Sequence, residues 1–386
     1  MKNGIAVLFL VSILISACIA EQQLVPTLTL PSTKAPEPTL TKTPTSTSTN
    51  TSIPPTVTPT LSPTSTSEPT FTATPLGGGS GLIAFTIDSE NDQSEIAVMN
   101  ADGGVMVQLT KNPFDDWYPA WSPDGKQIAF CSRTTKGADA QIFVMNADGS
   151  EVTQLTNTGE NCIPAWSPNG AQIVYVSRGK GIYVMNADGS AQTQLTHKSS
   201  MLVHPKWSPD GTKIIFESFE QNNTEIYVVN ADGSGLTNLT NHPADDKEPD
   251  WSPDGKEIVF VSDRHAHSYD EIYAMNADGS GVVQLTEGKL FANAPQWSPD
   301  GTRIAFFSIY GSDFQIYIIT SGVVTNLPLD YRNKISDFAW SPDGKQIVYV
   351  NDEYGNRDLL TINIDGTGIN FLTYDEVDEW FPVWSP

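Results

Sequence analysis

The chain has 386 residues and a formal net charge of −24 at pH 7. Residues 1–76 carry as many lysines as acidic side chains, so the whole excess of negative charge belongs to the rest of the chain. A domain this acidic is repelled by phosphate backbones and by anionic lipid, which excludes nucleic acid as a partner and favours cations or basic partners.

A positive start and the apolar stretch of residues 4–16 are typical of an export signal. The stretch ends in "ISAC" at 15–18, which resembles a bacterial lipobox, the motif whose cysteine is lipidated and becomes the new N-terminus. We therefore expect lipidation of Cys18, because diacylation gives stable anchoring. Two alternatives are ordinary signal cleavage after Ala17 or Ala20 and an uncleaved anchor, for which the apolar run is short.

Residues 19–76 are rich in Thr, Pro and Ser, as in "TPTSTSTNTSIPPTVTPT". Such a segment buries too little apolar surface to offset the entropy of ordering, so we expect a disordered, extended stalk that resembles O-glycosylated stalks. The glycine-rich residues 77–81 then form a hinge. We divide the chain into a lipoprotein signal peptide at 1–18, the stalk at 19–76 and a folded domain at 77–386.

From residue 82 onward the sequence repeats with a period of about 44 residues. Each repeat holds four short apolar segments, which read "PAW", "IAF", "IYVMNADG" and "QLT" or close variants. We name the corresponding strands a, b, c and d. Four short strands per repeat, with turn signals between them, are the sequence form of a β-propeller blade. The a segments predict seven blades and end at Trp121, Trp166, Trp207, Trp251, Trp297, Trp340 and Trp384.

The repeated turns support the same fold. In "SPDG", between strands a and b, proline fits the second turn position and glycine the left-handed position at the end. "NADG" serves the c–d hairpin in the same way, because Asp-Gly tolerates positive φ. These loops are not suited to bind calcium, because each offers one reliable carboxylate and calcium takes about six to eight oxygen ligands.

The ends of the repeat region predict a closed ring. It opens with a b strand at 82–87 and finishes with a lone a strand at 380–386. The C-terminal strand must therefore complete the blade that the N-terminal strands begin, which removes exposed strand edges. The predicted fold class is all-β: a seven-bladed β-propeller, closed by the C-terminal strand pairing with the N-terminal strands and preceded by a disordered stalk.

The repeat "PAWSPDGKQIAF…QIFVMNADGS…QLT" resembles the repeats of the TolB family of periplasmic β-propellers over residues 82–386. Members of that family have six blades and an N-terminal α/β domain, whereas this chain has seven predicted blades and a stalk. We therefore do not carry over the family's role in the Tol–Pal envelope system. Prolyl oligopeptidases also bear propellers, but no GxSxG nucleophile elbow occurs in this sequence.

The two faces of the predicted disc differ in character. Alternating strand directions place the a–b and c–d turns on one face, and the b–c and inter-blade d–a loops on the other. The first face repeats its sequence, whereas b–c loops such as "DSENDQSE" and "SDRHAHSYDE" differ from blade to blade. We therefore expect specificity on this irregular face and at the channel mouth that it surrounds.

Two similar segments on the irregular face, "DDWYP" at 115–119 and "DEWFP" at 378–382, belong to blades that become neighbours at the closure. Aromatic faces beside carboxylates suit sugar rings or cationic groups. Packing of the closure seam is the alternative role for the rings. The candidate ligand-binding residues are Trp117, Tyr118, Trp380, Phe381, Asp115, Asp116, Asp378 and Glu379.

The histidines also fall on the irregular face, across three successive blades. With nearby carboxylates they could bind a divalent metal, and oligogalacturonate lyases, a propeller family with TolB-like repeats, use such a metal. Ordinary exposed loop histidines are the competing interpretation, and we assign no metal and no other cofactor. The weak metal candidates are His204, His242, His265 and His267.

A cysteine pair lies on the same face. Cys131 ends a b strand, and Cys162 lies in the loop that leads into the next blade. In an oxidising compartment these two side chains could form a disulfide.

Three hypotheses about function follow, from different classes. The first is a non-catalytic propeller, tethered to the outer face of a bacterial membrane, that binds an envelope protein, a peptide or a carbohydrate. The second is a metal-dependent carbohydrate-active enzyme, similar to oligogalacturonate lyase, that acts at the channel mouth. The third is a structural element of the envelope. We expect the first: an exported monomer without catalytic residues, lipid-anchored to the cell membrane and facing the periplasm or the cell exterior.

Overall fold

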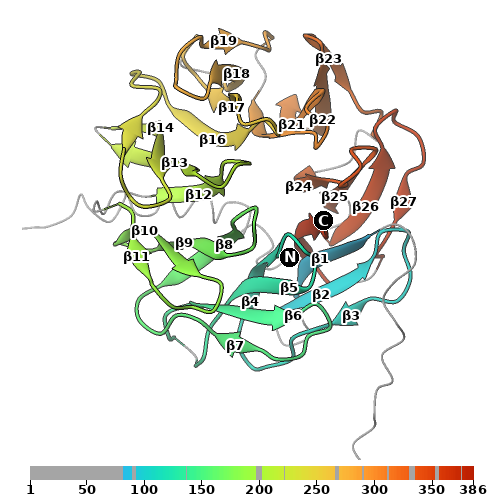
Figure 1. Cartoon of the computed structure of the whole chain (residues 1–386). Coiled ribbons are helices and arrows are strands. Elements are labelled where there is room, and N and C mark those ends of the chain that lie inside the picture. Colours follow the sequence, from blue (N-terminus) through green and yellow to red (C-terminus); the bar gives the residue numbers. More distant parts are fainter. Residues whose placement is uncertain are drawn as a thin grey trace, which may run out of the picture. The chain divides into compact units, whose positions relative to one another are not determined.

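The computed structural model describes residues 81–88, 93–135, 137–196, 202–220, 222–265, 269–288, 291–310, 313–329, 335–352, 356–374 and 376–386. The predicted signal peptide, Cys18 and the stalk lie outside these residues. Within them, 28 strands form seven four-stranded antiparallel sheets that stand around a common axis as the blades of a propeller (Figure 1). No helix in this described part is long and apolar enough to cross a membrane.

The blades follow one another in chain order, and the strands of each blade run from the axis outward. Blade 1 is β28 (Glu379–Trp384), β1 (Leu82–Asp88), β2 (Ser94–Asn100) and β3 (Val107–Gln108). Blade 2 is β4 (Asp116–Trp121), β5 (Gln127–Ser132), β6 (Gln141–Asn146) and β7 (Thr153–Gln154). Blade 3 is β8 (Asn161–Trp166), β9 (Gln172–Ser177), β10 (Gly181–Asn186) and β11 (Thr193–Gln194). Blade 4 is β12 (Leu202–Trp207), β13 (Lys213–Glu220), β14 (Asn223–Asn230) and β15 (Thr237–Asn238).

The remaining blades have the same order. Blade 5 is β16 (Asp246–Trp251), β17 (Glu257–Ser262), β18 (Glu271–Asn276) and β19 (Val283–Gln284). Blade 6 is β20 (Ala292–Trp297), β21 (Arg303–Tyr310), β22 (Asp313–Thr320) and β23 (Val323–Asn326). Blade 7 is β24 (Ile335–Trp340), β25 (Gln346–Asp352), β26 (Arg357–Asn363) and β27 (Asn370–Phe371). These seven sheets confirm the predicted blade count and the a–b–c–d order of each blade.

Blade 1 closes the ring as the sequence predicts. β28 pairs antiparallel with β1, and Ile83 lies opposite Trp384. Beyond the paired strands, Ser385 N donates a hydrogen bond to Leu82 O (2.7 Å), and Leu82 N donates to Ser385 Oγ (2.9 Å). The two ends of the described domain are therefore joined within one sheet, which leaves no innermost strand without a partner.

The "SPDG" turns adopt the geometry that their residues favour. In blade 2, Ser122 Oγ donates to Asp124 Oδ1 (2.8 Å), and Gly125 N donates to Ser122 O (2.9 Å) with Gly125 at a φ of 67°. Hydrogen bonds from Lys126 and Ser122 lower the pKa of Asp124 to about 2. Each turn is therefore held by its own side chains and needs no bound ion.

Tryptophans join six of the seven blades to the blade before them by the same hydrogen bond. The indole N–H of Trp166 donates to Ala120 O (3.1 Å), the carbonyl just before the tryptophan of blade 2. Trp207 and Trp384 repeat the contact with Ala165 O (3.1 Å) and Ala339 O (3.2 Å). The same bond is made by Trp121, Trp251 and Trp340, and these six rings are at most 9% exposed. Each ring therefore seals a blade interface by burial and fixes it by a directed hydrogen bond.

The threonine of "QLT" ties strand d to strand c inside a blade. In blade 1, Ile96 N donates to Thr110 Oγ1 (2.9 Å), and that hydroxyl donates to Glu95 Oε2 (2.7 Å). Blade 2 repeats the arrangement with Thr156 and Gln141. Buried polar groups are stabilising when they are paired in this way.

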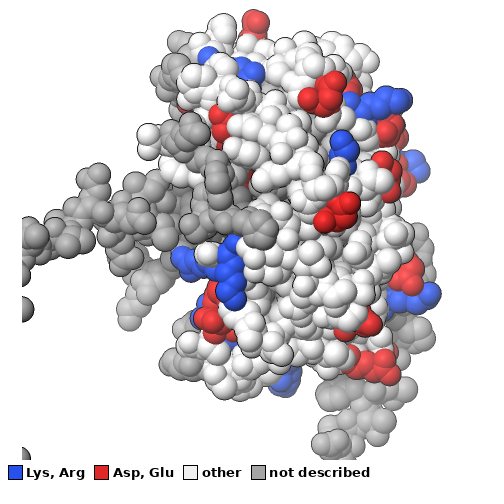
Figure 2. All heavy atoms as spheres, turned by 60° about the vertical axis from the view of Figure 1, so that its left-hand side comes forward, with Lys and Arg blue, Asp and Glu red and all other residues white. Residues whose placement is uncertain are grey.

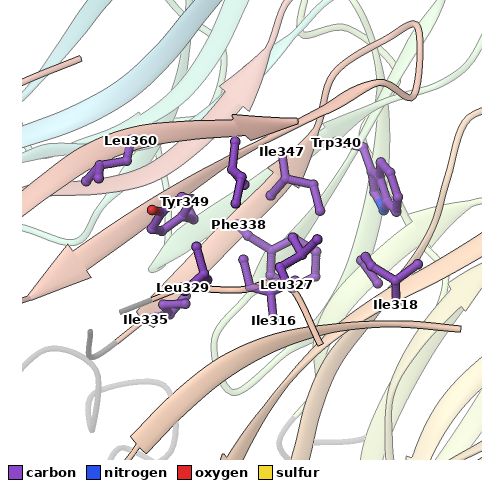
Figure 3. Packing of buried hydrophobic residues seen from close by; sticks show 12 residues of the cluster. Ile316, Ile318, Leu327, Leu329, Ile335, Phe338, Trp340, Ile347, Tyr349 and Leu360 are labelled. Carbon is purple, nitrogen blue, oxygen red and sulfur yellow. The ribbon is translucent and has the colours of Figure 1, made fainter. Parts of the chain in front are cut away.

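Blades 6 and 7 meet through apolar side chains instead. Pro328 occupies the position of that threonine, and Ile335 begins β24 where four other innermost strands begin with Asp, Asn or Glu. Figure 3 shows Ile335 grouped with Leu327, Leu329 and Phe338 in this core cluster. The substitutions leave Gln315 Nε2 buried without a hydrogen-bond acceptor. Around Ile335 this seam therefore relies on burial of apolar surface, whereas near Trp340 it keeps hydrogen bonds from Trp340 Nε1 to Gln296 O (3.3 Å) and from Gln296 Nε2 to Phe338 O (2.9 Å).

The indole hydrogen bond can be tested at two tryptophans. Trp297 Nε1 is buried without an acceptor, whereas Trp166 Nε1 has one. We expect Trp166→Phe to lower the free energy of unfolding by about 1 kcal/mol more than Trp297→Phe, because only the first substitution breaks a hydrogen bond. Urea denaturation of both variants measures the difference. Equal losses would show that the indole N–H contributes nothing beyond the burial of the ring.

Candidate functional site

The innermost strands share a bulge at their third residue. In blade 2 the pairing with β5 slips between Trp117 and Ala120. In six of the seven strands the third residue has a positive φ between 47° and 56° and is followed by proline, which has no N–H to give to the sheet. We call the third residues the axial residues; in blades 1 to 7 they are Phe381, Tyr118, Ile163, His204, Glu248, Ala294 and Asp337.

The axial residues act on one another across the propeller. Burial raises the pKa of Asp337 to about 7, and the positive charge of His204 opposes the rise. Burial and then the Asp337 carboxylate raise the pKa of Tyr118 to about 12. Because His204 and Asp337 belong to blades 4 and 7, on opposite sides of the ring, their interaction passes through the axis. Tyr118, His204 and Asp337 therefore share one environment.

This environment has an aromatic side and a charged side. Tyr118 and Phe381, on neighbouring blades, have ring centroids 4.3 Å apart. His204, Glu248 and Asp337 lie on the other blades, and a third of the His204 side chain is exposed to solvent. The site can therefore present ionisable groups and aromatic rings to the same ligand.

A hydrogen-bond chain organises the charged side. His204 Nδ1 lies 2.9 Å from Oε1 of Glu217, a residue of β13 that is almost fully buried. Glu217 Oε2 accepts from Glu248 N (2.7 Å), and Glu248 Oε2 accepts from Ala294 N (2.6 Å). The chain links blades 4, 5 and 6, and it fixes the orientation of both glutamates.

Burial and charge pairing set the ionisation of this chain. Burial alone would lower the pKa of His204, but the Glu217 carboxylate beside it raises the pKa above its usual range. Burial would raise the pKa of Glu217, and the paired His204 reverses the direction. Burial and then the neighbouring Glu217 raise the pKa of Glu248. The axis therefore holds a charged His–Glu pair next to carboxyl groups that take up protons more readily than free ones.

Three of the four predicted aromatic residues come together. Tyr118 contacts Phe381, and the Trp380 ring centroid lies 6.3 Å from that of Phe381. Trp380 itself is only 4% exposed, with the guanidinium of Arg357 3.6 Å from its ring centroid. Trp117 lies against Arg133, whose guanidinium is 5.4 Å from the ring centroid.

The four predicted acidic residues occupy different surroundings. Asp378 Oδ2 accepts from Arg357 (3.0 Å), and Asp115 O accepts from Arg133 N (3.3 Å). Asp116 and Glu379 are fully buried at the starts of β4 and β28. Glu379 accepts a hydrogen bond from Thr373 (2.6 Å). The structure therefore ties Asp378 to the Trp380–Arg357 cluster and buries the first residues of the two strands.

The predicted histidines are not gathered at one point. His204 is axial, His242 lies in the loop before β16, where its Nδ1 accepts from Ala244 N (3.1 Å), and His265 is exposed in the loop after β17. His267 lies outside the described residues. Among the residues with a described position, no group of three or more His, Cys, Asp or Glu side chains is arranged to bind a metal ion.

Cys131 of β5 and Cys162 of β8 are joined by a disulfide, with their Cα atoms 5.3 Å apart. The bond connects blades 2 and 3 next to the axial residue Ile163, whose N–H donates to Cys131 Sγ (3.2 Å).

The acidity of the surface is distributed. On the face that Figure 2 shows, Asp and Glu side chains lie in small groups, often beside Lys or Arg. In the turns, Lys126 pairs with Asp124 (3.0 Å) and Lys256 pairs with Asp254 (2.7 Å). Such exposed pairs are screened by water and salt, whereas the axial carboxyl groups are largely shielded from both.

The fold and this axial arrangement define the class of protein as a seven-bladed β-propeller. The sequence pattern of the TolB beta propeller domain matches residues 61–197 and 163–386, and the chain belongs to this family. The family resemblance predicted from the repeats is thus confirmed.

Individual relatives share less with the chain. A stretch of 58 residues is 38% identical to dipeptidyl-peptidase 5 of Porphyromonas gingivalis; it covers 14% of this chain and only 8% of that protein. TolB from Acinetobacter baumannii is 22% identical, with a TM-score of 0.53 over 79% of this chain and 67% of that one. An oligogalacturonate lyase from Vibrio parahaemolyticus is 15% identical, with a TM-score of 0.58 over 76% and 86%. At these identities the two structures establish the fold alone.

Two aspartates with pKa values shifted in opposite directions, Asp337 at the axis and Asp300 in a turn, predict opposite effects of pH on stability. The raised pKa of Asp337 means that its contribution to stability is present at low pH and is lost as pH rises from about 4 to 7. Asp337→Asn should therefore raise Tm by about 2–4 °C at pH 8 and by progressively less toward pH 4. In Asp300 of a turn, hydrogen bonds from Ser298 and Thr302 lower the pKa to about 2, so its contribution is present above pH 4 and is lost toward pH 2.

Asp300→Asn is the matched control. It should lower Tm at pH 8, and its difference from the unmodified chain should fade only below pH 4. Thermal melts of the three proteins from pH 3 to 8 check both signs. An Asp337→Asn variant that melts below the unmodified chain at pH 8 would contradict a raised pKa at the axis.

Proposed function

We propose that the protein is a non-catalytic binding propeller that takes its ligand at the axis. The observation that carries the proposal is the division of the axial residues into an aromatic side and a charged side. The repeated residues of each blade are used for packing and turns, whereas the axial position differs in every blade. A position that the scaffold holds in one geometry in six of the seven blades and leaves free in chemistry is suited to recognition.

The ligand that fits carries a positive charge next to an apolar or aromatic group, as a basic peptide segment does. The charged His204–Glu217 pair leaves Glu248 and Asp337 as acceptors for a cation, and Tyr118 and Phe381 offer ring faces to it. The net charge of −24 favours the approach of a basic partner over long distance. A cation at the axis would also favour ionisation of Asp337, so binding should strengthen as pH rises through about 7.

The proposal places this propeller on the outer face of a bacterial membrane, through a lipid on Cys18 and the stalk at 19–76. The lipobox resemblance of residues 15–18 and the Thr/Pro/Ser composition of the stalk support this display. The Cys131–Cys162 disulfide also suits an oxidising compartment outside the cytoplasm.

A peptide and glycan array probed with the full chain tests the axial site. We expect retention of basic peptides that contain aromatic residues. Asp337→Asn and Tyr118→Ala should each weaken binding by about tenfold, which is the size of one shielded ionic or cation–π contact. Asp148→Asn, in a c–d turn on the repeated face, should leave binding unchanged. Retention that none of the axial variants alters would contradict the proposal.

A metal-dependent carbohydrate-active enzyme is the second candidate, because His204 is axial and the fold is similar to that of an oligogalacturonate lyase. Retention of acidic oligosaccharides on the array, together with a stoichiometric transition metal that is lost in His204→Ala, would favour this candidate over the first.

Membrane display is tested separately. Cys18→Ser removes the only side chain that a lipobox modification can use, so the chain should move from the membrane fraction to the soluble exported fraction. Cell fractionation and mass spectrometry of the N-terminal peptide measure the change. A variant that stays in the membrane fraction would point to an uncleaved anchor.

A further inference from the structure

The outer edge of blade 6 differs from that of the other blades. Its outermost strand, β23, has four residues, whereas the outermost strands of the other six blades have two residues each. β23 is the last strand of its sheet and lies at the rim of the propeller (Figure 1), and all of its residues are exposed. Natural sheets usually shorten or charge such an edge, because its unpaired N–H and C=O groups can pair with another chain. By comparison with the other blades, β23 is neither shortened nor charged.

A shorter turn accounts for the longer strand. In blade 5, residues 277–282 separate β18 from β19, whereas in blade 6 only Ser321 and Gly322 separate β22 from β23. Both residues have a positive φ, 49° and 79°, which is the geometry of the two-residue turn that keeps antiparallel strands paired up to the tip. The ladder therefore begins with Thr320 opposite Val323, directly at the turn.

The register decides which main-chain groups of β23 face outward. Pairs in an antiparallel ladder alternate between those that exchange hydrogen bonds and those that do not. Leu327 N donates to Ile316 O (2.9 Å), so two residues earlier the N–H and C=O of Thr325 also point toward β22. Those of Val324 and Asn326 then point away from the sheet, and no strand of the described residues pairs with them. The outer edge thus offers both donors and acceptors to another strand.

Charge sets this edge apart as well. With a net charge of −24, two copies of the chain repel each other, and a contact about a two-fold axis places residues near the axis opposite their own counterparts. An acidic residue in such a contact therefore faces the same acidic residue, which is destabilising. Residues 314–329, which hold most of β22 and all of β23, contain no charged side chain. In the other six blades the c–d turn carries an aspartate: Asp102, Asp148, Asp188, Asp232, Asp278 and Asp365. Blade 6 is therefore the blade whose edge can meet a second copy without opposing acidic groups.

We propose that two copies of the chain pair through β23, antiparallel about a two-fold axis, so that the two copies of blade 6 form one continuous sheet. With Thr325 of each copy at the axis, Val324 of one copy exchanges main-chain hydrogen bonds with Asn326 of the other. Val323 and Val324 are 61% and 37% exposed and point to opposite faces of the strand, so pairing removes apolar surface from water on both faces.

The contact is small. Four paired residues per copy bury less than the roughly 1,200 Å² at which stable interfaces of standard size begin, so the dimer should be weak and reversible. This dimer replaces the monomer that the sequence alone leads us to expect. It involves none of the axial residues, so it is independent of the proposed binding at the axis.

Sedimentation equilibrium of the full chain tests the proposal. Cys18→Ser serves as the starting protein, so that no lipid can drive association, and Cys131 and Cys162 remain bonded to each other. We expect the average mass to rise from monomer toward dimer between about 10 μM and about 1 mM protein. The rise should be larger at high salt, because salt screens the repulsion between the two acidic copies.

Charge placed at the two-fold axis should control association. Thr325→Lys sets two like charges opposite each other, so it should weaken dimerisation by about tenfold, and Thr325→Glu should do the same. An equal mixture of these two variants should restore association, because opposite charges then face each other. Val283→Lys is the matched control: the valine lies in β19 of blade 5 and is 53% exposed, and its substitution should leave association unchanged.

Cysteine substitutions test the register. Opposite residues that exchange no hydrogen bonds have Cα atoms about 4.5 Å apart, which lies within the range that a disulfide spans. Thr325→Cys should therefore give a disulfide-linked dimer under mild oxidation. Val323→Cys should not, although this position is well exposed, because its two copies lie about 13 Å apart along the paired strands.

Thermal melts separate association from folding. All variants should have the same Tm, because every substituted side chain is exposed. A chain that stays monomeric at every concentration would leave the edge to a different partner and overturn the proposal. Equal association of Thr325→Lys and the starting protein, or equal cross-linking of Val323→Cys and Thr325→Cys, would also overturn it.

Discussion

The burial of apolar side chains between neighbouring blades, with a tryptophan at the end of each innermost strand, is the interaction on which the domain depends. Each blade is a separate four-stranded sheet, and no strand is shared between blades. A blade alone would leave both faces exposed, so stability must come from the interfaces. The tryptophan at the end of each innermost strand covers that interface, and in six blades its N–H reaches the carbonyl before the neighbouring tryptophan. Because the donor and the acceptor both belong to the repeat, each blade sets the position of the next.

The innermost strand also contains the one position, its third residue, that differs in every blade. In six blades a proline after the third residue removes a donor from the sheet, and the third residue stands in a bulge with a positive φ. The scaffold depends on the tryptophan and the proline but not on the residue just before the proline. His204, Glu248 and Tyr118 can therefore differ without disturbing the ring. This separation explains how a strongly repetitive sequence supports an axis with two chemically distinct sides.

The fold can be predicted from the sequence because its signals are local and repeated. The tryptophans, the "SPDG" turns and the lone C-terminal strand each specify a blade, a hairpin or the closure within a few residues. The axial site can be predicted only in part. The segments "DDWYP" and "DEWFP" point to Tyr118 and Phe381, whereas Glu248 enters only as one of the carboxylates near the histidines and Asp337 is missed. The third position of each innermost strand is the signal that could have found them. The pairing of His204 with Glu217, a residue of β13, has no local signal because it joins residues 13 apart in the chain through the register of two strands.

Residues that look equivalent in sequence can also have different partners. Asp116 and Asp246 follow loops of equal length, and an arginine stands just after the next strand in both blades. Arg264 pairs with its aspartate, whereas Glu160 of the following loop lies beside Arg133 and Trp117 lies against it. The partner of the arginine is therefore decided by a residue of the next blade, which a comparison of aligned repeats does not consider. In a propeller, side chains from two blades determine the chemistry of each seam, so the residues of both blades must be considered together.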